Sequence, residues 1–445
     1  MSDKNRETKI FCGHLLDIRN QTWIDNACVT IAGGNITEVA GFSEAVKAGG
    51  CTSDGIGGGT SNDIGGRSSC GSGGATSNDI GGGCIDLRKM WVLPGLIDAH
   101  VHIGLDPATA PFLTITRKHT AYLAILALRN AQRCLDAGFT AIRDCGAWEY
   151  TGVGVKQAID AGLCKGPRIK ACGNMLTITG GHGDSYFAPN TDVGALLGVR
   201  ADGPDEIRKA IRENVKHGAD FVKACATGGI LSDSDSPGAT QYTLPELEAI
   251  AAEASREGMA SSVHAIGTEG IKLALKAGIT SIEHGMMLDG ECIELLLERG
   301  AFMTATLSPL YWIDKCGEAS GISRFNVEKC RMVLEKNIES VQKAYKAGVK
   351  LAFGTDSGTP HNEHGNNAFE FELLVKAGIK PLDAIKMATL NAAELLGISG
   401  KAGAVEPGMS ADIIAVDADP EADMTALRHV GFVMRDGEVY RHSLR

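Results

Sequence analysis

The chain has 445 residues, a length that suits two to three ordinary domains or one large barrel with an appendage. Apolar residues make up 44% of the chain and charged residues 22%, a balance that is typical of soluble globular proteins and excludes disordered and fibrous ones. The net charge of -11 comes without any run of lysine or arginine. A nucleic-acid partner is therefore not expected, and a small molecule is the better candidate substrate.

The sequence contains no segment that is typical of a membrane protein. Residues 1–9 are polar and charged, unlike a secretory signal. The longest apolar run, Ala121–Leu128, is far shorter than the roughly 18 residues that cross a bilayer. The 13 cysteines include no C-x-x-C pair, which favours reduced thiols. We therefore expect a cytoplasmic protein without a membrane partner.

Both ends of the chain predict short β-strands. Ala27–Ile31 and Asn35–Val39 alternate apolar and polar residues on either side of Gly33-Gly34, which indicates a hairpin. The C-terminal end is similar, with strand-like runs at Asp412–Val416, Val430–Arg435 and Glu438–Tyr440. Because neither set of strands could bury its apolar face alone, we expect one small β-sandwich domain made of residues 1–90 plus 401–445.

A glycine-rich segment, residues 49–84, interrupts the first of these ends. It contains the sequence Thr-Ser-Asn-Asp-Ile-Gly-Gly twice, at 60–66 and 76–82. A stacked β or calcium-binding repeat would need more copies and a regular apolar position. The composition instead favours a flexible, locally duplicated insert in the β domain.

The middle of the chain, residues 91–400, has a different sequence pattern. A helical stretch ends in glycine, which suits the left-handed position after a helix, and a short β-branched run follows. The pattern recurs before Phe139–Asp144, Phe221–Ala226, Ala260–His264, Ile279–His284, Ala301–Thr306 and Val349–Asp356. Together with Val92–His100 and Pro167–Cys172, these runs predict eight strands alternating with helices, the number that closes a (β/α)8 TIM barrel of the α/β class.

The C-terminal ends of the predicted barrel strands carry an unusual set of side chains. In such barrels, chemistry takes place at these ends. The first strand ends in His100-Val101-His102, and because strand side chains alternate, both imidazoles point to one side. The other strand ends hold Lys223 on the fourth strand, His264 on the fifth, His284 on the sixth and Asp356 on the eighth. Each residue alone has an ordinary structural explanation, but their joint placement predicts a metal site.

The stretch Leu93–His102 resembles the opening signature of the amidohydrolase superfamily, and the later lysine, histidines and aspartate are similar to that superfamily's pattern. The resemblance covers nearly the whole chain. It is closest to the imidazolonepropionase-like branch, which includes Xaa-Pro dipeptidases, other metal-dependent carboxypeptidases and amidases acting on ochratoxin or phenylurea compounds. Val222–Gly229 and His361–Asn366 are the segments most like that branch.

The resemblance implies a binuclear centre of two divalent metal ions, for which zinc is suited by the ligands. His100, His102 and Asp356 would hold one ion, and His264 and His284 would hold the second. Lys223 would be carbamylated and bridge the two. A hydroxide shared by the ions would attack an amide carbonyl, because coordination lowers the pKa of water from 15.7 to about 7. Asp356 would accept the hydroxide proton and pass it to the leaving nitrogen.

Two loop residues are candidates for contacts with the substrate. His182 lies between glycines in the loop after the third strand and could contact the substrate carbonyl, which makes it a second candidate catalytic residue. Tyr242 lies in the loop after the fourth strand, where the resemblance implies an aromatic hydroxyl facing a substrate carboxylate. Arg143 and Asp144, at the end of the second strand, are interpreted as a structural ion pair.

The leading hypothesis is therefore a metal-dependent hydrolase that cleaves the amide bond of an N-acyl amino acid or dipeptide. A cyclic-amide or xenobiotic amide hydrolase, of the imidazolonepropionase, ochratoxin or phenylurea type, would use the same centre. An inactive scaffold relative is a third hypothesis, which the complete set of predicted ligands disfavours. The resemblance also implies a homo-oligomer.

Overall fold

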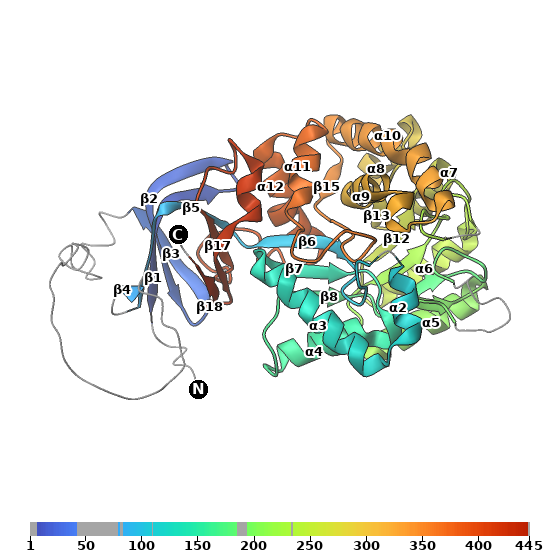
Figure 1. Cartoon of the computed structure of the whole chain (residues 1–445), viewed down its shortest axis with the longest axis horizontal. Helices are drawn as coiled ribbons and strands as arrows, with labels where there is room; N and C mark the ends of the chain where they lie inside the picture. The colour runs from blue at the N-terminus through green and yellow to red at the C-terminus, as the bar shows by residue number, and fades with distance from the viewer. Residues whose placement is uncertain are drawn as a thin grey trace. The chain divides into compact units, whose positions relative to one another are not determined.

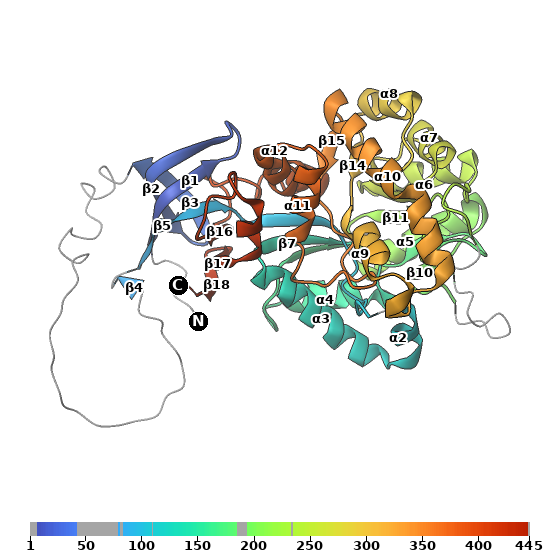
Figure 2. The same cartoon turned by 45° about the horizontal axis from the view of Figure 1, so that its top comes forward.

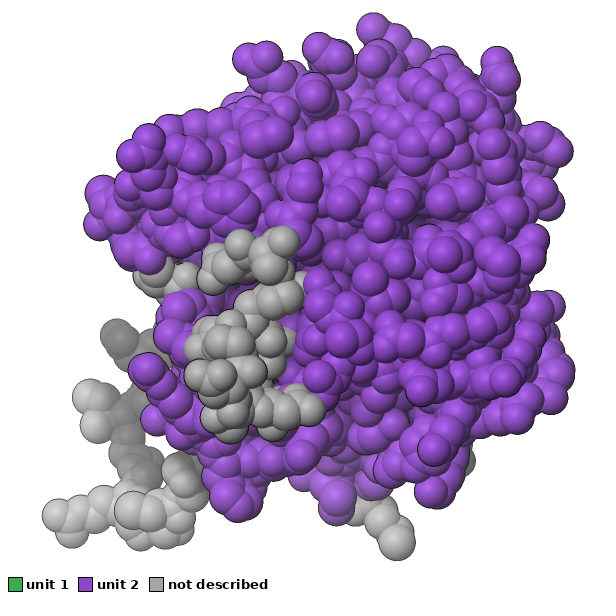
Figure 3. Space-filling model, turned by 90° about the vertical axis from the view of Figure 1, so that its right-hand side faces the viewer, with its two compact units in different colours: residues 1–95, 400–445 green, residues 96–399 purple. Residues whose placement is uncertain are grey.

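A computed structural model describes residues 7–41, 79–80, 83–108, 110–184, 194–232 and 235–443. The chain forms two compact units. Unit 1 comprises residues 1–95 and 400–445, and unit 2 comprises residues 96–399. Figure 3 shows one face of unit 2. The predicted insert at residues 49–84 lies outside the described residues except for 79–80 and 83–84.

Unit 1 is built on one mixed sheet of eight strands that joins the two ends of the chain (Figure 1). Its strands are β1 (Thr8–Asp17), β2 (Thr22–Ala32), β3 (Asn35–Gly41), β4 (Asp79–Ile80), β5 (Cys84–Pro94), β16 (Ile413–Val416), β17 (Val430–Arg435) and β18 (Glu438–His442). They follow the order β18-β17-β16-β5-β1-β2-β3, with β4 paired to β5. β5 is parallel to β1 and antiparallel to β16, so it links the N-terminal strands to the C-terminal ones.

The predicted hairpin near the N-terminus is confirmed in unit 1, whose mixed sheet contains strands from both ends of the chain. β2 and β3 are antiparallel, and the turn between them has φ of 59° at Gly33 and 83° at Gly34, which favours glycine. Val29 at one end of the strand order and Phe432 at the other belong to the same buried apolar cluster. The single sheet therefore folds over one shared core, in the manner of a sandwich.

Unit 2 is a closed parallel barrel, which confirms the predicted (β/α)8 fold. Its eight strands are β6 (Leu96–Val101), β7 (Phe139–Asp144), β8 (Arg168–Ala171), β11 (Val222–Cys225), β12 (Ser261–Ala265), β13 (Ser281–His284), β14 (Phe302–Thr304) and β15 (Lys350–Ala352). Two short strands, β9 (Met175–Thr177) and β10 (Gly198–Arg200), extend the sheet beside β11. The barrel closes because Asp356 N donates to His100 O at 2.7 Å, and Asp220 N donates to Ala171 O at 2.7 Å.

Helices surround the barrel strands. Figure 2 shows α3 and α4 beside β7. The helices are α2 (Pro111–Arg117), α3 (Thr120–Asp136), α4 (Thr151–Asp160), α5 (Gly203–His217), α6 (Leu244–Arg256), α7 (Thr268–Ala277), α8 (Gly290–Arg299), α9 (Ser308–Cys316), α10 (Arg324–Ala347), α11 (Phe369–Lys376), α12 (Pro381–Lys386) and α13 (Ala392–Leu395). The predicted glycine at a helix end is confirmed at α7, which Gly278 ends with φ of 92°. At the start of α6, Thr243 and Glu246 form a reciprocal capping box.

Within the described residues, no helix is both long and apolar enough to cross a membrane. Ten of the described cysteines carry free thiols. The expectation of reduced thiols is wrong at Cys84, which is disulfide-bonded. Residue spacing could not predict this bond, because a disulfide depends on the distance between cysteines in space.

Candidate metal centre

The candidate site residues predicted from the strand ends lie around one cavity of about 320 Å³ in unit 2. His100, His102, Lys223, His264, His284 and Asp356 all line this cavity. Its remaining walls are mostly apolar and include Phe112, Met175, Ile230, Ile266, Met286 and Leu310. The barrel topology brings these residues together, because parallel strands end at the same rim.

His100, His102 and Asp356 form a compact group at the joint between β6 and the segment after β15. Asp356 Oδ1 lies 3.5 Å from His100 Nε2 and 3.3 Å from His102 Nε2. One ligand atom from each of the three residues lies within 4.8 Å of the others. Two imidazoles and a carboxylate at this spacing can hold one divalent cation.

A hydrogen bond to the other ring nitrogen orients each imidazole. His100 Nδ1 bonds Glu283 Oε2 at 2.7 Å, and His102 Nδ1 bonds the carbonyl of Gly146 at 3.0 Å. These bonds leave Nε2 of both rings directed at Asp356. Metal-binding histidines are oriented in the same way, which fixes the tautomer and raises ligand basicity.

His264 and His284 lie side by side near the first group. Their ring centroids are 4.6 Å apart, and the His284 and His100 centroids are 5.0 Å apart. His284 Nδ1 bonds Thr306 Oγ1 at 2.7 Å, which leaves Nε2 available. His264 uses Nε2 instead, which bonds the Gly228 carbonyl at 3.2 Å and leaves Nδ1 available.

Lys223 lies in the middle of β11 and is 1% exposed. Its Nζ has no hydrogen-bond partner in the part of the chain that the structure describes. An isolated buried ammonium is strongly unfavourable unless it is paired or chemically changed. The position therefore fits an amine converted to a carbamate, whose oxygens would face the surrounding imidazoles.

The electrostatics of the site favour neutral imidazoles at His100, His264 and His284 and an ionised carboxylate. At His102, burial lowers the pKa but the adjacent Asp356 carboxylate outweighs it, so the pKa of that imidazole is raised. Burial, followed by the charge of Lys223, lowers the pKa of His100 to about 4. Burial also lowers the pKa of His264 and His284 well below their usual range. Burial opposes ionisation of Asp356, but the adjacent imidazoles outweigh it and hold its pKa well below normal. Neutral imidazoles and carboxylates are the forms that bind metal ions.

Two of the site residues have left-handed backbone conformations, with φ of 74° at His284 and 54° at Asp356. Residues other than glycine rarely adopt this region, and the surrounding structure must hold them there. Here the turn at the strand end aims each side chain into the cavity. Two such outliers among the six candidate ligands agree with a site built for binding.

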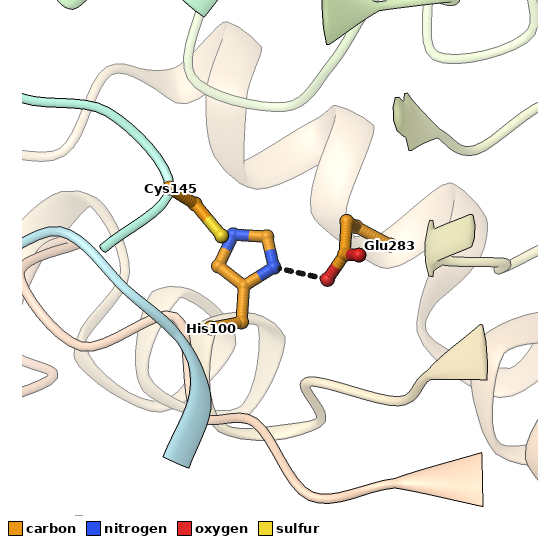
Figure 4. Close-up of side chains that lie close together, drawn as sticks. All are labelled: His100, Cys145 and Glu283. Carbon is orange, nitrogen blue, oxygen red and sulfur yellow. Dashed lines mark hydrogen bonds and ion pairs between the residues drawn. The ribbon is translucent and has the colours of Figure 1, made fainter. Parts of the chain in front are cut away.

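A second group of potential ligands, His100, Cys145 and Glu283, is shown in Figure 4. Glu283 is fully buried, and its Oε1 accepts hydrogen bonds from Arg143 at 2.6 Å, Ser262 at 2.7 Å and Ser281 at 2.5 Å. Burial raises the pKa of the Cys145 thiol to about 12, so the thiolate is disfavoured. This group therefore supports His100 instead of forming a separate metal site.

Glu283 and Asp98 are supporting residues that strand-end reasoning missed. Asp98 accepts hydrogen bonds from the backbone N–H groups of His100 and Thr355, both at 3.1 Å, and thereby ties β6 to the segment that carries Asp356. For Asp98 the available signal was an acidic residue inside an otherwise apolar run, Leu96–Ala99. Residues of this kind are almost never fully buried without partners.

His182 lines the cavity and its ring stacks on that of His264, with centroids 4.3 Å apart. Its Nδ1 lies 2.9 Å from Ser232 Oγ. Tyr242 is not brought to the cavity. It is 1% exposed, and its hydroxyl donates to the Ala201 carbonyl at 3.2 Å.

The predicted ion pair between Arg143 and Asp144 is wrong. Arg143 pairs with Glu283 at 2.6 Å, and Asp144 accepts from the backbone N–H of Ile103 at 3.2 Å. Adjacent strand residues point to opposite faces, so neighbours in β7 cannot pair with each other.

Comparisons with known proteins agree with the geometry of the site. The Amidohydrolase family matches residues 91–441. Ochratoxinase from Aspergillus niger is 32% identical over 370 residues, which cover 79% of this chain and 75% of ochratoxinase.

Among solved structures, a Xaa-Pro dipeptidase with bound methionine in the active site has a TM-score of 0.82 and 33% identity, covering 98% of this chain and 100% of that one. A prolidase complexed with N-methylphosphonate-L-proline has a TM-score of 0.83 and 29% identity, with coverage of 98% and 100%. The chain therefore belongs to the amidohydrolase family, whose members generally use metal ions, and is a hydrolase acting on carbon–nitrogen bonds.

Proposed function

We propose that this protein is a carboxypeptidase-like or prolidase-like amidohydrolase that cleaves the amide bond of an N-acyl amino acid or dipeptide. The observation that carries the proposal is Lys223, whose buried Nζ has no partner in the described chain and which lines one cavity with five histidines and Asp356. An unmodified Lys223 has no hydrogen-bond partner there among the described residues, whereas a carbamate on it could bind the same metal ions as the neighbouring imidazoles.

The proposed centre holds two divalent ions, zinc being the leading candidate. His100, His102 and Asp356 would bind the first, and His264 and His284 would bind the second, with carbamylated Lys223 between them. Divalent ions bound there would supply a hydroxide nucleophile at neutral pH and polarise the substrate carbonyl. The lowered pKa values of His100, His264 and His284 and the unpaired lysine fit this role.

Proton transfer is assigned to Asp356. Its carboxylate is held ionised by the imidazoles, so it can take a proton at a carboxylate oxygen when the nucleophile attacks. The same oxygen then delivers the proton to the leaving nitrogen, which would otherwise depart as an unstable anion. His182, which shares the cavity, would contact the reacting amide through Nε2.

The walls of the cavity support an apolar group on the substrate. Ile266, Met286, Leu310 and Ile313 line one part of the cavity and belong to a single buried apolar cluster. Among the described residues, Lys223 is the only lysine or arginine of the lining. An aliphatic or aromatic side chain next to the scissile amide is therefore favoured over an acidic one.

A xenobiotic amide of the ochratoxin type is the second candidate substrate. The 32% identity to ochratoxinase favours it, and the same centre and apolar walls would serve.

Assembly into a homo-oligomer also stays a prediction.

A hydrolysis screen tests the proposal. Zinc-loaded or manganese-loaded protein prepared with bicarbonate is assayed against N-acyl amino acids, Xaa-Pro dipeptides, cyclic amides and aryl amides. We expect turnover of the N-acyl amino acids or dipeptides and a loss of more than about 100-fold in Lys223→Ala. Lys156→Ala is the matched control. Lys156 forms an ion pair with Asp220, and the variant should keep its activity. Turnover of cyclic amides alone would exclude the carboxypeptidase-like function.

A further inference from the structure

A buried lysine holds the loop that follows β11 beside the metal centre. Lys329 on α10 is 3% exposed. Its Nζ donates to the Gly229 carbonyl at 2.7 Å, to the Ser232 carbonyl, and to the Asp235 carbonyl at 3.3 Å, and it lies 3.4 Å from Asp235 Oδ1. A buried charge is tolerated only with such a set of partners, so the contacts are specific to this position.

Asp235 is the centre of the resulting network. Its Oδ2 accepts from the backbone N–H of Gly229 at 3.2 Å and from Gln241 Nε2 at 3.1 Å, and Ser232 Oγ donates to its Oδ1. Its Oδ2 also lies 3.5 Å from His182 Nδ1. Burial opposes ionisation, but the contacts with His182, Ser232 and Lys329 hold the pKa of Asp235 well below its usual range. The network therefore presents a permanent carboxylate to the back of the His182 ring.

The hydrogen bonds determine which nitrogen of His182 carries a proton. A serine hydroxyl has one hydrogen, and that of Ser232 is donated to Asp235. The contact of 2.9 Å between Ser232 Oγ and His182 Nδ1 must then have Nδ1–H as the donor. Protonated Nδ1 is thus committed to the network, which leaves Nε2 for other contacts of a ring that lines the cavity.

Packing fixes the plane of the same ring. The backbone N–H of His182 donates to Gln241 Oε1 at 3.0 Å, and the ring stacks on His264 at an interplanar angle of 23°. A Cβ placed on Gly229 would lie 2.0 Å from Cε1 of His182 and 2.4 Å from both Nδ1 and Nε2, so Gly229 lies against this edge of the ring. Any side chain at residue 229 would therefore push the ring from its position.

We propose that Asp235 is a positioning residue for His182, and that Lys329 holds Asp235 in place for that purpose. The network keeps Nδ1 protonated and turns Nε2 toward the substrate amide. This inference rests on the proposed function for the amide substrate, for the metal-loaded centre and for the contact of His182 with the substrate. The competing explanation is an ion pair that merely stabilises the loop, which predicts an effect on stability and none on turnover.

Kinetics of isosteric variants separate the two explanations. In the metal-loaded enzyme, Asp235→Asn should lower kcat by about 30-fold or more and change KM by less than about threefold, since orientation matters most in the transition state. The double variant with His182→Asn should be no slower than His182→Asn alone, because the carboxylate acts only through that ring. Asp220→Asn is the matched control. Asp220 is a half-buried carboxylate paired with Lys156 and Lys170, and its loss should lower the Tm without lowering kcat.

A measurement that needs no activity completes the test. Long-range proton–nitrogen NMR of histidine-labelled protein, with His182→Asn for assignment, reports which nitrogen is protonated. We expect protonated Nδ1 in the wild type and loss of that state in Asp235→Asn and in Gly229→Ala. Unchanged tautomers in Asp235→Asn, or multiplicative losses in the double variant, would overturn the proposal. Wild type that hydrolyses no amide but shows the expected tautomers would refute the proposed function and leave the positioning role supported.

Discussion

Each imidazole of the candidate centre is oriented by a hydrogen-bond partner that does not line the cavity. Glu283 is the most connected of these partners, because it bonds His100 Nδ1 and also neutralises the buried guanidinium of Arg143. The ligand geometry of His100 therefore depends on a residue one position before another candidate ligand, His284. Such supporting residues commonly change metal affinity when they are replaced.

Replacing Glu283 by glutamine tests this dependence. Glu283→Gln leaves Arg143 buried without a counter-charge, so unfolding should become easier by about 3 kcal/mol. The affinity for metal should fall by about 10-fold or more, measured by competition with a chelator. Glu253→Gln is the matched control, since Glu253 is 5% exposed and pairs with Arg212 and Arg256. A Glu283→Gln protein with wild-type metal affinity would show that the carboxylate stabilises the fold but does not affect the metal site.

A buried histidine next to the centre makes stability depend on pH. His364 is 3% exposed, and burial lowers its pKa from 6.5 to about 3. The folded state thus binds fewer protons than the unfolded state between these pKa values, so stability is complete above pH 6.5 and declines as the pH falls. Relative to His364→Asn, the wild type should lose about 1.4 kcal/mol between about pH 7.5 and about pH 5.5. Urea unfolding of both proteins at the two pH values measures this loss. A difference in unfolding free energy between wild type and His364→Asn that does not change with pH would contradict the lowered pKa of His364.

At the scale of elements, several helices of the barrel end at a glycine that comes shortly before the next strand. Gly278 ends α7 with φ of 92°, and a Cβ there would meet no atom closer than 3.9 Å. Its requirement for glycine is therefore one of backbone conformation and not of space. Gly154, inside α4, has ordinary helical φ and open surroundings, so no such requirement applies to it.

These two glycines should respond in opposite directions to alanine. Gly278→Ala should destabilise the protein by about 1 kcal/mol, because alanine is strained in the left-handed region. Gly154→Ala should stabilise it by up to about 1 kcal/mol, because alanine favours helix and lowers the entropy of the unfolded chain. Thermal unfolding of both variants is the measurement. Equal effects would show that the helix stop does not depend on the backbone of Gly278.

At the scale of the whole molecule, the candidate ligands come from strands that are far apart in the chain. His100 lies on β6, Lys223 on β11, His264 on β12, His284 on β13, and Asp356 follows β15. A metal ion bound between them, as proposed, would tie these strands to one another and would bind only the folded barrel. Folding and metal binding would then be coupled.

Removal of metal should therefore lower the thermal stability of the protein. At a free metal concentration about 1,000 times Kd, binding adds about 4 kcal/mol to the free energy of unfolding. A chelator should lower the Tm of the wild type, and it should have a smaller effect on His100→Ala, which lacks one ligand. A Tm that is unchanged by the chelator in wild-type protein loaded with zinc would contradict this coupling.

The strand ends could be predicted from sequence because three local signals coincide there: a glycine stop, a β-branched run and side-chain alternation. His100 and His102 obey that alternation. Side-chain alternation could not predict where Glu283 points. The backbone at the next residue, His284, is left-handed, so the regular alternation of the strand ends there. Tyr242 depends on the path of a loop and not on a strand, and it lies buried against Ala201. Contacts between distant segments, such as Lys329 with Asp235, leave no periodic signal in the sequence.

The metal content of the purified protein tests the central proposal most directly. Elemental analysis of wild type prepared with zinc and bicarbonate should find two divalent ions per chain. Lys223→Ala should bind fewer, because the proposed bridge between the ions is lost. Wild-type protein that binds no divalent metal under these conditions, or a Lys223→Ala variant with full metal content and full activity, would contradict a binuclear centre built on this lysine.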